Sequence, residues 1–170
     1  MVIINECIYN YFYEGLPSYI QPNEINFVRS GTDIEHISTA RITLVTYNLL
    51  LQPALREHVE AQQFKCVVVD ESHYLKNRNA KRTKTILPIL QKATRVLLLS
   101  GTPALARPEE LWSQLEGVCP GEFGSFTPFA TRYCNAHRGR FGWDTKGSSH
   151  LVRLSPSVHA CARICRVWWQ

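Results

Sequence analysis

The stretch Val67-Val68-Val69-Asp70-Glu71-Ser72-His73 places two adjacent carboxylates directly after a run of β-branched residues. A continuous apolar run with polar ends is typical of a strand buried on both faces of a parallel sheet. One predicted strand–helix–strand unit later, Val96-Leu97-Leu98-Leu99 runs into Ser100-Gly101-Thr102-Pro103. Ligands of open α/β sheets bind beyond the carboxyl ends of the strands. We therefore expect the functional residues to lie in these two turns, close together on one edge of the sheet.

The flanking sequence continues the same alternation of strands and helices. Apolar and β-branched runs predict strands over residues 25–28, 42–47, 65–70 and 95–100. Helical patterns and capping residues predict helices over residues 54–61, 79–90, 108–117 and 127–134, with Pro88 disturbing the end of the second. Strands that alternate with helices predict an α/β fold, a parallel sheet with flanking helices.

Composition bounds the class of protein. The chain has 170 residues, of which 45% are hydrophobic and 19% are charged, a globular balance that excludes a disordered chain. No apolar run approaches the ~18 residues of a spanning helix, so we expect no membrane partner. The first residues lack the basic and apolar regions of a signal peptide, which predicts an intracellular protein whose six cysteines are free thiols.

Charge is distributed unevenly along the chain. The net charge is +5, but residues 132–170 contain seven basic side chains and Asp144 as their only acidic one. The body of the protein is therefore close to neutral. A basic terminal segment favours an anionic partner.

The two turns carry residues suited to nucleotide chemistry. An Asp at the end of a buried strand can hold Mg²⁺ through water, and a following Glu can orient and deprotonate an attacking water. Asp70 and Glu71 fit these roles, with a solvated turn as the alternative. Ser100, Gly101 and Thr102 combine hydroxyls with a glycine that lets the backbone pass close to a ligand. For them, a plain strand-terminating turn is the alternative.

Asp-Glu-x-His followed by Ser-Gly-Thr-Pro resembles motifs II and III of the superfamily-two helicases and translocases. Ser-Gly-Thr-Pro is the form found in Swi/Snf-type DNA translocases, whereas most RNA helicases carry Ser-Ala-Thr. Further stretches resemble the annealing-helicase branch, especially the members with a Ran-binding-type zinc finger and a nuclease domain. These stretches are residues 45–50, 70–76, 101–104, 107–111, 132–137 and 143–149.

The resemblance implies part of the first RecA-like lobe of an ATP-dependent DNA translocase, incomplete at both ends. It covers residues 24–150, leaving residues 1–23 as a non-matching segment and residues 151–170 as a divergent basic tail. It implies that ATP and Mg²⁺ are the cofactors and that duplex or forked DNA is the partner, with replication-fork proteins as further partners and the nucleus as location. The resemblance also implies that four residues couple the state of the bound nucleotide to the binding of DNA. They are His73, Ser100, Gly101 and Thr102.

The sequence also lacks parts that the resemblance would require. No Gly-x-x-x-x-Gly-Lys-Ser/Thr phosphate loop occurs in these residues. The second lobe, which supplies arginine fingers in the family, is absent as well. We therefore expect the chain alone to be inactive as an ATPase, although the parent family hydrolyses ATP. The alternative is a non-catalytic fragment that binds DNA or a protein partner.

Two further groups of residues have less specific patterns. Basic residues cluster after the Asp-Glu pair and could contact a DNA backbone, with a solvated helix face as the alternative. They are Lys76, Arg78, Lys81, Arg82 and Lys84. Five Cys and His residues of the carboxyl-terminal third match no standard zinc spacing, so we do not expect a zinc site. They are Cys134, His137, His159, Cys161 and Cys165.

Overall fold

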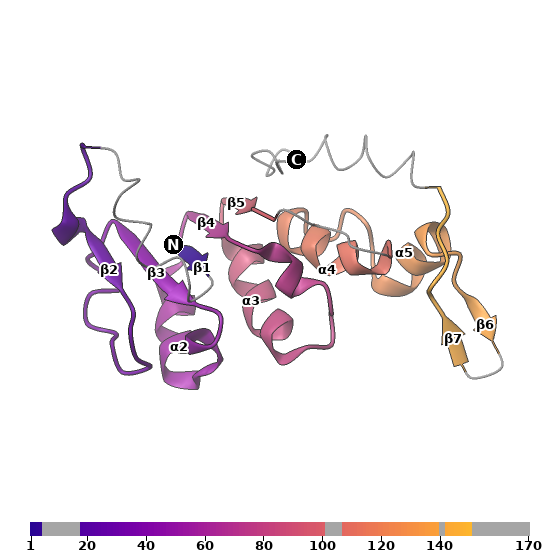
Figure 1. The fold of residues 1–170 in the computed structure, drawn as a ribbon, viewed down its shortest axis with the longest axis horizontal. Coiled ribbons are helices and arrows are strands. Elements are labelled where there is room, and N and C mark those ends of the chain that lie inside the picture. Colours follow the sequence, from indigo (N-terminus) through magenta and orange to yellow (C-terminus); the bar gives the residue numbers. More distant parts are fainter. Residues whose placement is uncertain (5–17, 101–106, 140–141, 151–170) are drawn as a thin grey trace.

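The computed structural model describes residues 1–4, 18–100, 107–139 and 142–150, and shows a sheet flanked by helices (Figure 1). Five parallel strands form the sheet in the order β2-β3-β1-β4-β5. The α/β fold with a parallel sheet is therefore confirmed. The strands are β1 (Val2–Ile4), β2 (Ile25–Phe27), β3 (Ile42–Thr46), β4 (Cys66–Val69) and β5 (Arg95–Leu98).

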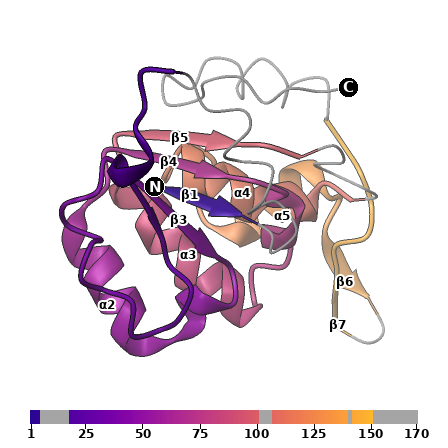
Figure 2. The ribbon, with the colours of Figure 1, turned by 60° about the vertical axis from the view of Figure 1, so that its left-hand side comes forward.

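The helices cover the sheet and extend beyond it. Helices α2 and α3 lie side by side along one face (Figures 1 and 2), and α4 packs against α3 and β5. Beyond α5 a two-stranded antiparallel hairpin projects at the end of the molecule opposite β2 (Figure 1). The α-helices are α2 (Pro53–Gln62), α3 (Lys81–Lys92), α4 (Glu109–Val118) and α5 (Phe126–Tyr133). The hairpin strands are β6 (His137–Gly139) and β7 (Gly142–Asp144). The 3₁₀ helices are η2 (Pro22–Glu24), η3 (Leu49–Leu51) and η4 (Ser72–Leu75).

The core lies between the sheet and its helices. Alternate residues of β4 and β5, such as Val67 and Val96, are buried against apolar side chains of the helices, such as Leu55 and Leu90. Burial of each such side chain contributes about 1.5–3 kcal/mol. Gly117 lets α4 approach α3 closely, because a Cβ there would lie 2.8 Å from Cδ1 of Leu90.

One strand lies where the sequence did not place it. Residues 1–23 were expected outside the α/β core, but Val2–Ile4 form the middle strand, paired with β3 on one side and β4 on the other. The Val68 amide donates a hydrogen bond to the Met1 carbonyl over 3.0 Å. A strand of three residues is too short to show a period of two, so its pairing decides its structure.

The remaining boundaries agree with the expected ones within about two residues. Two other details differ from the expectation. Helix α3 continues past Pro88 to Lys92. Pro88 has no N–H to donate to the carbonyl of Lys84, an exposed residue one turn earlier. Among the described cysteines, Cys66 and Cys134 are free but Cys119 is in a disulfide, which corrects the expectation of free thiols.

Most of the non-matching segment, residues 5–17, and the basic tail, residues 151–170, lie outside the described residues. Within the described part of the chain, no helix combines the length and the apolarity needed to cross a bilayer.

Candidate functional site

The Asp-Glu pair lies at the carboxyl edge of the sheet, at the end of β4. Strands β1 and β5 flank β4, and the connections between strands change direction around β1, as they do at ligand sites of open α/β sheets. Two backbone bonds of 2.8 Å tie the turn to β5: the Leu99 amide donates to the Val69 carbonyl and the Ser72 amide donates to the Leu99 carbonyl. The two predicted turns are thus joined directly.

Tyr47, at the end of β3, holds the backbone of this turn. Its hydroxyl donates a hydrogen bond to the Asp70 carbonyl over 2.7 Å and lies 3.4 Å from the Glu71 carbonyl. Burial, and secondarily the neighbouring Asp70 charge, raises the pKa of this hydroxyl, so it stays a donor. Glu71 has φ 49° and ψ 50°, a left-handed conformation that is unfavourable for a residue with a side chain.

Asp70 has an uncompensated carboxylate oxygen. In the described part of the molecule, no hydrogen-bond partner reaches its buried Oδ2. Burial first, and then the adjacent Glu71 charge, raises the pKa of the Asp70 carboxyl, although the Glu71 amide and His73 partly oppose the shift. Because its surroundings disfavour the ionised form of Asp70, a bound cation would stabilise that form. The residue therefore fits the expected Mg²⁺ ligand, because Mg²⁺ prefers carboxylate oxygens and water.

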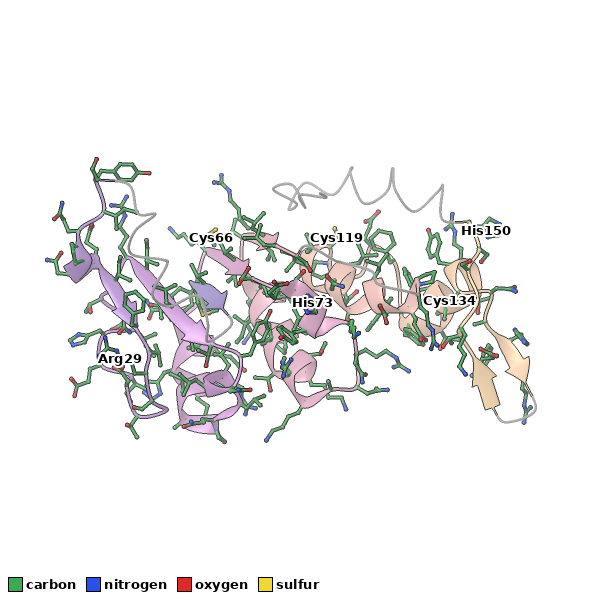
Figure 3. All side chains as sticks on the ribbon, viewed as in Figure 1. Arg29, Cys66, His73, Cys119, Cys134 and His150 are labelled. Atoms are coloured by element: carbon green, nitrogen blue, oxygen red, sulfur yellow. The ribbon has the colours of Figure 1, made fainter. Side chains whose placement is uncertain are left out.

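His73 connects the acidic pair to the second turn. Its Nδ1 lies 3.0 Å from Oε2 of Glu71 and 3.2 Å from Oγ of Ser100. The structure thus brings together three residues that sequence reasoning had singled out. Figure 3 shows His73 near the middle of the molecule, well away from the hairpin end. Gly101 and Thr102, the other predicted coupling residues, lie outside the described residues.

Residues of α4 fix the segment after the acidic pair. The Ser72 hydroxyl donates to Oε1 of Gln114 over 3.1 Å, and the Ser113 hydroxyl donates to the Leu75 carbonyl. Sequence reasoning missed Ser113 and Gln114, although both are polar residues on the buried face of a predicted helix. Polar residues at core positions are the signal that could have identified them.

The basic cluster divides into residues with different surroundings. Lys76 lies 4.0 Å from Glu110, and the Arg78 guanidinium stacks over Phe126 at 3.8 Å from the ring centroid. Lys81 and Lys84 are exposed on α3.

Arg82, the fifth member of that cluster, lies against the site. Its guanidinium is 4.8 Å from the ring centroid of Tyr74 and 5.5 Å from that of Tyr47. The Nε atom is buried and has no hydrogen-bond partner in the described structure. Arg82 therefore packs against the two tyrosines whose rings meet edge to face beside the Asp-Glu turn.

The described zinc candidates do not form a metal centre. Burial, followed by the Glu109 charge, raises the pKa of the Cys134 thiol to about 11, which disfavours the thiolate that zinc needs. Nδ1 of His137 lies 3.0 Å from the Asn135 carbonyl. Over the described ranges, no three His, Cys, Asp or Glu side chains are grouped to hold a metal ion. His159, Cys161 and Cys165 lie outside the described residues.

Comparison with solved structures identifies the same fold. The SWI2/SNF2 ATPase core of Sulfolobus solfataricus, solved in complex with dsDNA, matches with a TM-score of 0.73 and 20% identity. The match covers 97% of this chain and 32% of that chain. A second structure, the Sulfolobus solfataricus SWI2/SNF2 ATPase core domain, matches with a TM-score of 0.67 and 21% identity over 96% of this chain and 32% of that chain. At this identity the likeness shows the fold, a partial RecA-like lobe.

Sequence comparison identifies closer relatives. Human "DNA annealing helicase and endonuclease ZRANB3" is 49% identical over 141 residues, which are 79% of this chain and 13% of that protein. The Xenopus tropicalis "SWI/SNF-related matrix-associated actin-dependent regulator of chromatin subfamily A-like protein 1" is 41% identical over 84% of this chain and 14% of its own length. The chain thus spans about an eighth to a seventh of these relatives.

The SNF2-related domain matches residues 19–157, a range that extends beyond the expected 24–150 at both ends and includes the acidic pair, His73 and Ser100. The sequence resemblance is therefore confirmed. With this match, and with a sheet whose carboxyl edge carries the acidic turn, the chain belongs to the SNF2-related domain family.

Proposed function

We propose that residues 24–150 are the part of an ATP-dependent DNA translocase's first RecA-like lobe that contains the Asp-Glu motif. In this proposal the parent protein is a nuclear annealing helicase that remodels replication forks and acts in DNA repair. Residues 1–18 and 158–170 lie outside the family match, although Val2–Ile4 form the middle strand of the sheet. The similarity to ZRANB3 supports the annealing-helicase assignment. The observation that carries the proposal is the buried oxygen of Asp70 beside Glu71, which has no hydrogen-bond partner among the described residues.

Asp70 would hold Mg²⁺ through water, with its buried oxygen as the acceptor. The chemistry that Mg²⁺ supplies when bound with ATP is neutralisation of charge on the phosphate oxygens. Glu71, whose side chain is 39% exposed, is free to accept a proton from an attacking water. The Tyr47 hydrogen bond fixes the backbone from which both carboxylates project.

His73 is placed to transmit a change at Glu71 to the second turn. Its Nδ1 lies within hydrogen-bond distance of both Glu71 and Ser100, so a movement of one of them alters the contact with the other. Ser100, with Gly101 and Thr102, would pass that change to the DNA-binding face. Duplex or forked DNA is the proposed partner, supported by the Sulfolobus core, which was solved in complex with dsDNA.

A different class of function remains as the second candidate: a non-catalytic fragment that binds DNA or a protein partner. The observation that favours it is the lack of a Gly-x-x-x-x-Gly-Lys-Ser/Thr sequence in these 170 residues. The two candidates differ in whether the Asp-Glu turn binds a divalent cation.

Paramagnetic Mn²⁺, used in place of Mg²⁺ with ATP, separates the candidates. We expect Mn²⁺ to broaden the amide NMR signals of Asp70 and its neighbours first, and Asp70→Asn to remove this broadening. Glu57→Gln is the matched control, because Glu57 is an exposed carboxylate on α2. Broadening spread equally over surface carboxylates, unchanged by Asp70→Asn, would refute the catalytic assignment and favour the non-catalytic fragment.

A further inference from the structure

A cavity lies away from the Asp-Glu turn. It has a volume of about 480 Å³ and is bounded by the segment between η4 and α3, the starts of α4 and α5, and strand β7. Neither Asp70 nor Glu71 lines it. Cavities of about 300–1,000 Å³ are typical of small-ligand sites. The volume is therefore sufficient for one nucleotide.

Aromatic side chains form two sides of this cavity. Trp143, on β7, is 64% exposed, which is unusual for a large aromatic residue. Phe126, at the start of α5, is fixed by Arg78 over its face and by the edge of Trp112 at 5.7 Å between ring centroids. The Phe126–Arg78 stack is thus already formed, whereas much of the Trp143 ring is open to a ligand.

The charges around the cavity are compensated except at Arg78. Glu109 lies 3.7 Å from Arg107 and accepts a hydrogen bond from the Thr145 hydroxyl. Glu110 lies 4.0 Å from Lys76. Arg78 makes no ion pair with any described carboxylate, and its guanidinium lies over the ring of Phe126. A guanidinium that stacks through its face still has its in-plane N–H groups available for an anion such as phosphate.

Carboxamides complete the lining. Asn77 and Asn79 are exposed on the same segment as Arg78. Oδ1 of Asn77 accepts a hydrogen bond from the Asn79 amide over 2.9 Å, which orients this segment. The side-chain NH₂ group of Asn77 and the carboxamide of Asn79 are then available to donate to or accept from the polar edge of a base.

We propose that this cavity binds an unpaired nucleotide of single-stranded DNA. The base stacks on Trp143, the phosphate accepts hydrogen bonds from Arg78, and Asn77 and Asn79 contact the base edge. An exposed aromatic ring beside a cationic group is the arrangement by which proteins bind single strands without sequence preference. The inference rests on the proposed DNA function, and adds a contact to single-stranded DNA that is separate from the nucleotide-hydrolysis site.

The balance of charges sets the expected salt dependence. With one uncompensated cation, the site neutralises one phosphate, or two if Lys76 leaves Glu110. The logarithm of the binding constant should then fall with the logarithm of salt concentration by a slope of about −0.7 to −1.4. Stacking, which depends little on salt, supplies the rest. Loss of a stacked base weakens binding by between about 5-fold and 100-fold.

Fluorescence anisotropy with a labelled oligo(dT) and a labelled duplex of equal length tests the proposal on the 170-residue chain. Trp143→Ala and Arg78→Gln are the test variants, and Trp143→Phe keeps a stacking ring. Tyr19→Ala and Arg29→Gln are matched controls, because Tyr19 is a 70% exposed aromatic and Arg29 is an exposed arginine far from the hairpin (Figure 3). Circular dichroism of each variant verifies folding.

We expect Trp143→Ala and Arg78→Gln each to weaken oligo(dT) binding at least about 5-fold, with Trp143→Phe close to wild type and both controls unchanged. Binding of the duplex should change less than 2-fold. Equal losses for duplex and single strand would overturn the proposal in favour of a backbone-binding surface. Oligo(dT) binding that neither test variant changes would overturn it while leaving the DNA function intact. A chain that binds neither DNA would refute both proposals.

Discussion

At the residue scale, the Asp-Glu turn combines two energetically unfavourable features, a buried polar atom and a left-handed backbone conformation. Asp70 carries a buried oxygen without a described partner, and Glu71 adopts a left-handed backbone conformation. Such features persist only where surrounding contacts determine them. The Tyr47 hydroxyl and the backbone bond from Ser72 to Leu99 are the contacts that do so. Their removal should therefore affect the turn before it affects the sheet.

Tyr47→Phe tests this arrangement. The substitution removes the hydroxyl that donates to the Asp70 carbonyl and keeps the ring in the core. Loss of one such bond from a buried group costs about 1–2 kcal/mol in the free energy of unfolding. Urea denaturation should show this loss. Tyr74→Phe is the control, because no described group accepts from or donates to the Tyr74 hydroxyl. Equal destabilisation by both variants would mean that the Tyr47 bond contributes nothing specific.

Asp70→Asn should stabilise the fold at neutral pH. The raised pKa of Asp70 means that the folded state binds its proton more tightly than the unfolded state does. The ionised carboxylate therefore lowers stability at pH values above its folded pKa, and this penalty fades as the pH falls toward the ordinary carboxyl range. We expect a gain of a few tenths to about 1 kcal/mol at pH 7.

In urea titrations that gain should stay level while the pH is above the folded pKa of Asp70, and should shrink as the pH falls below it toward the ordinary carboxyl range. Glu57→Gln, an exposed carboxylate on α2, should show no such trend. A destabilised Asp70→Asn variant at pH 7 would show that the carboxylate has partners which compensate its charge.

Sequence reasoning predicted that the residues of this turn meet, but not which contacts support the turn. Asp70, Glu71, His73 and Ser100 were predicted to meet because both stretches end neighbouring parallel strands, and the distances around His73 confirm it. Arg82 was predicted as a DNA contact or a solvated side chain, and its packing was not predicted, since a basic residue on a helix face carries no signal of the two tyrosines that it stacks on. Contacts between residues distant in sequence depend on packing rather than on local pattern.

At the scale of elements, Ser149 ties the segment that follows the hairpin to the end of α5. The last carbonyls of α5 accept hydrogen bonds from Ser149: its hydroxyl donates to the Arg132 carbonyl over 2.6 Å and its amide to the Tyr133 carbonyl over 2.8 Å. Helix carbonyls at a carboxyl end lack helical partners, so this contact satisfies them. It also fixes where the chain leaves β7, and so supports the position of Trp143 beside the cavity.

Gly147→Ala should loosen this joint. A Cβ at residue 147 would lie 2.8 Å from the Cys134 carbonyl oxygen and 3.1 Å from Cβ of Asn135, both too close for a side chain. Relief requires the segment to move away from α5, at a cost of about 1–3 kcal/mol. Hydrogen–deuterium exchange should show faster exchange of the Ser149 amide.

The matched variant is Gly139→Ala, in the hairpin itself. There a Cβ would meet its nearest neighbour at 3.5 Å, an ordinary contact, so exchange at Ser149 should stay at the wild-type rate. An unchanged Ser149 amide in Gly147→Ala would show that the segment tolerates the extra carbon without moving.

The elements differ in how far their sequences define them. Strands β4 and β5 were predicted because continuous apolar runs with polar ends have few other structures in a globular domain. Strand β1 was missed because Val2–Ile4 is short and its neighbours in the sheet are remote in sequence. Helix α3 outlasts Pro88 because apolar residues on both sides of the proline, Ile86 and Ile89, are buried in the core, and that burial outweighs one lost helical bond.

At the scale of the whole molecule, the cavity and the Asp-Glu turn are separate, but the segment that lines the cavity follows the turn in the chain. Segment 76–79, which lines the cavity, directly follows η4, which Ser113 and Gln114 hold against α4. A ligand in the cavity therefore contacts a segment continuous with the Asp-Glu turn. Because the two segments are consecutive in the chain, DNA bound in the cavity could shift the Asp-Glu turn, which is the proposed nucleotide site.

Hydrolysis of ATP by these 170 residues alone should be negligible. The Asp-Glu turn is formed, but the sequence contains no Gly-x-x-x-x-Gly-Lys-Ser/Thr loop to hold the β- and γ-phosphates. Positioning and charge stabilisation of the transferring phosphoryl group supply most of the rate in such enzymes, so a base without that clamp has little effect. A phosphate-release assay with forked DNA should give the same background for the wild type and for Glu71→Gln. DNA-stimulated release that Glu71→Gln abolishes would contradict this expectation and would mean that other groups of the chain hold the phosphates.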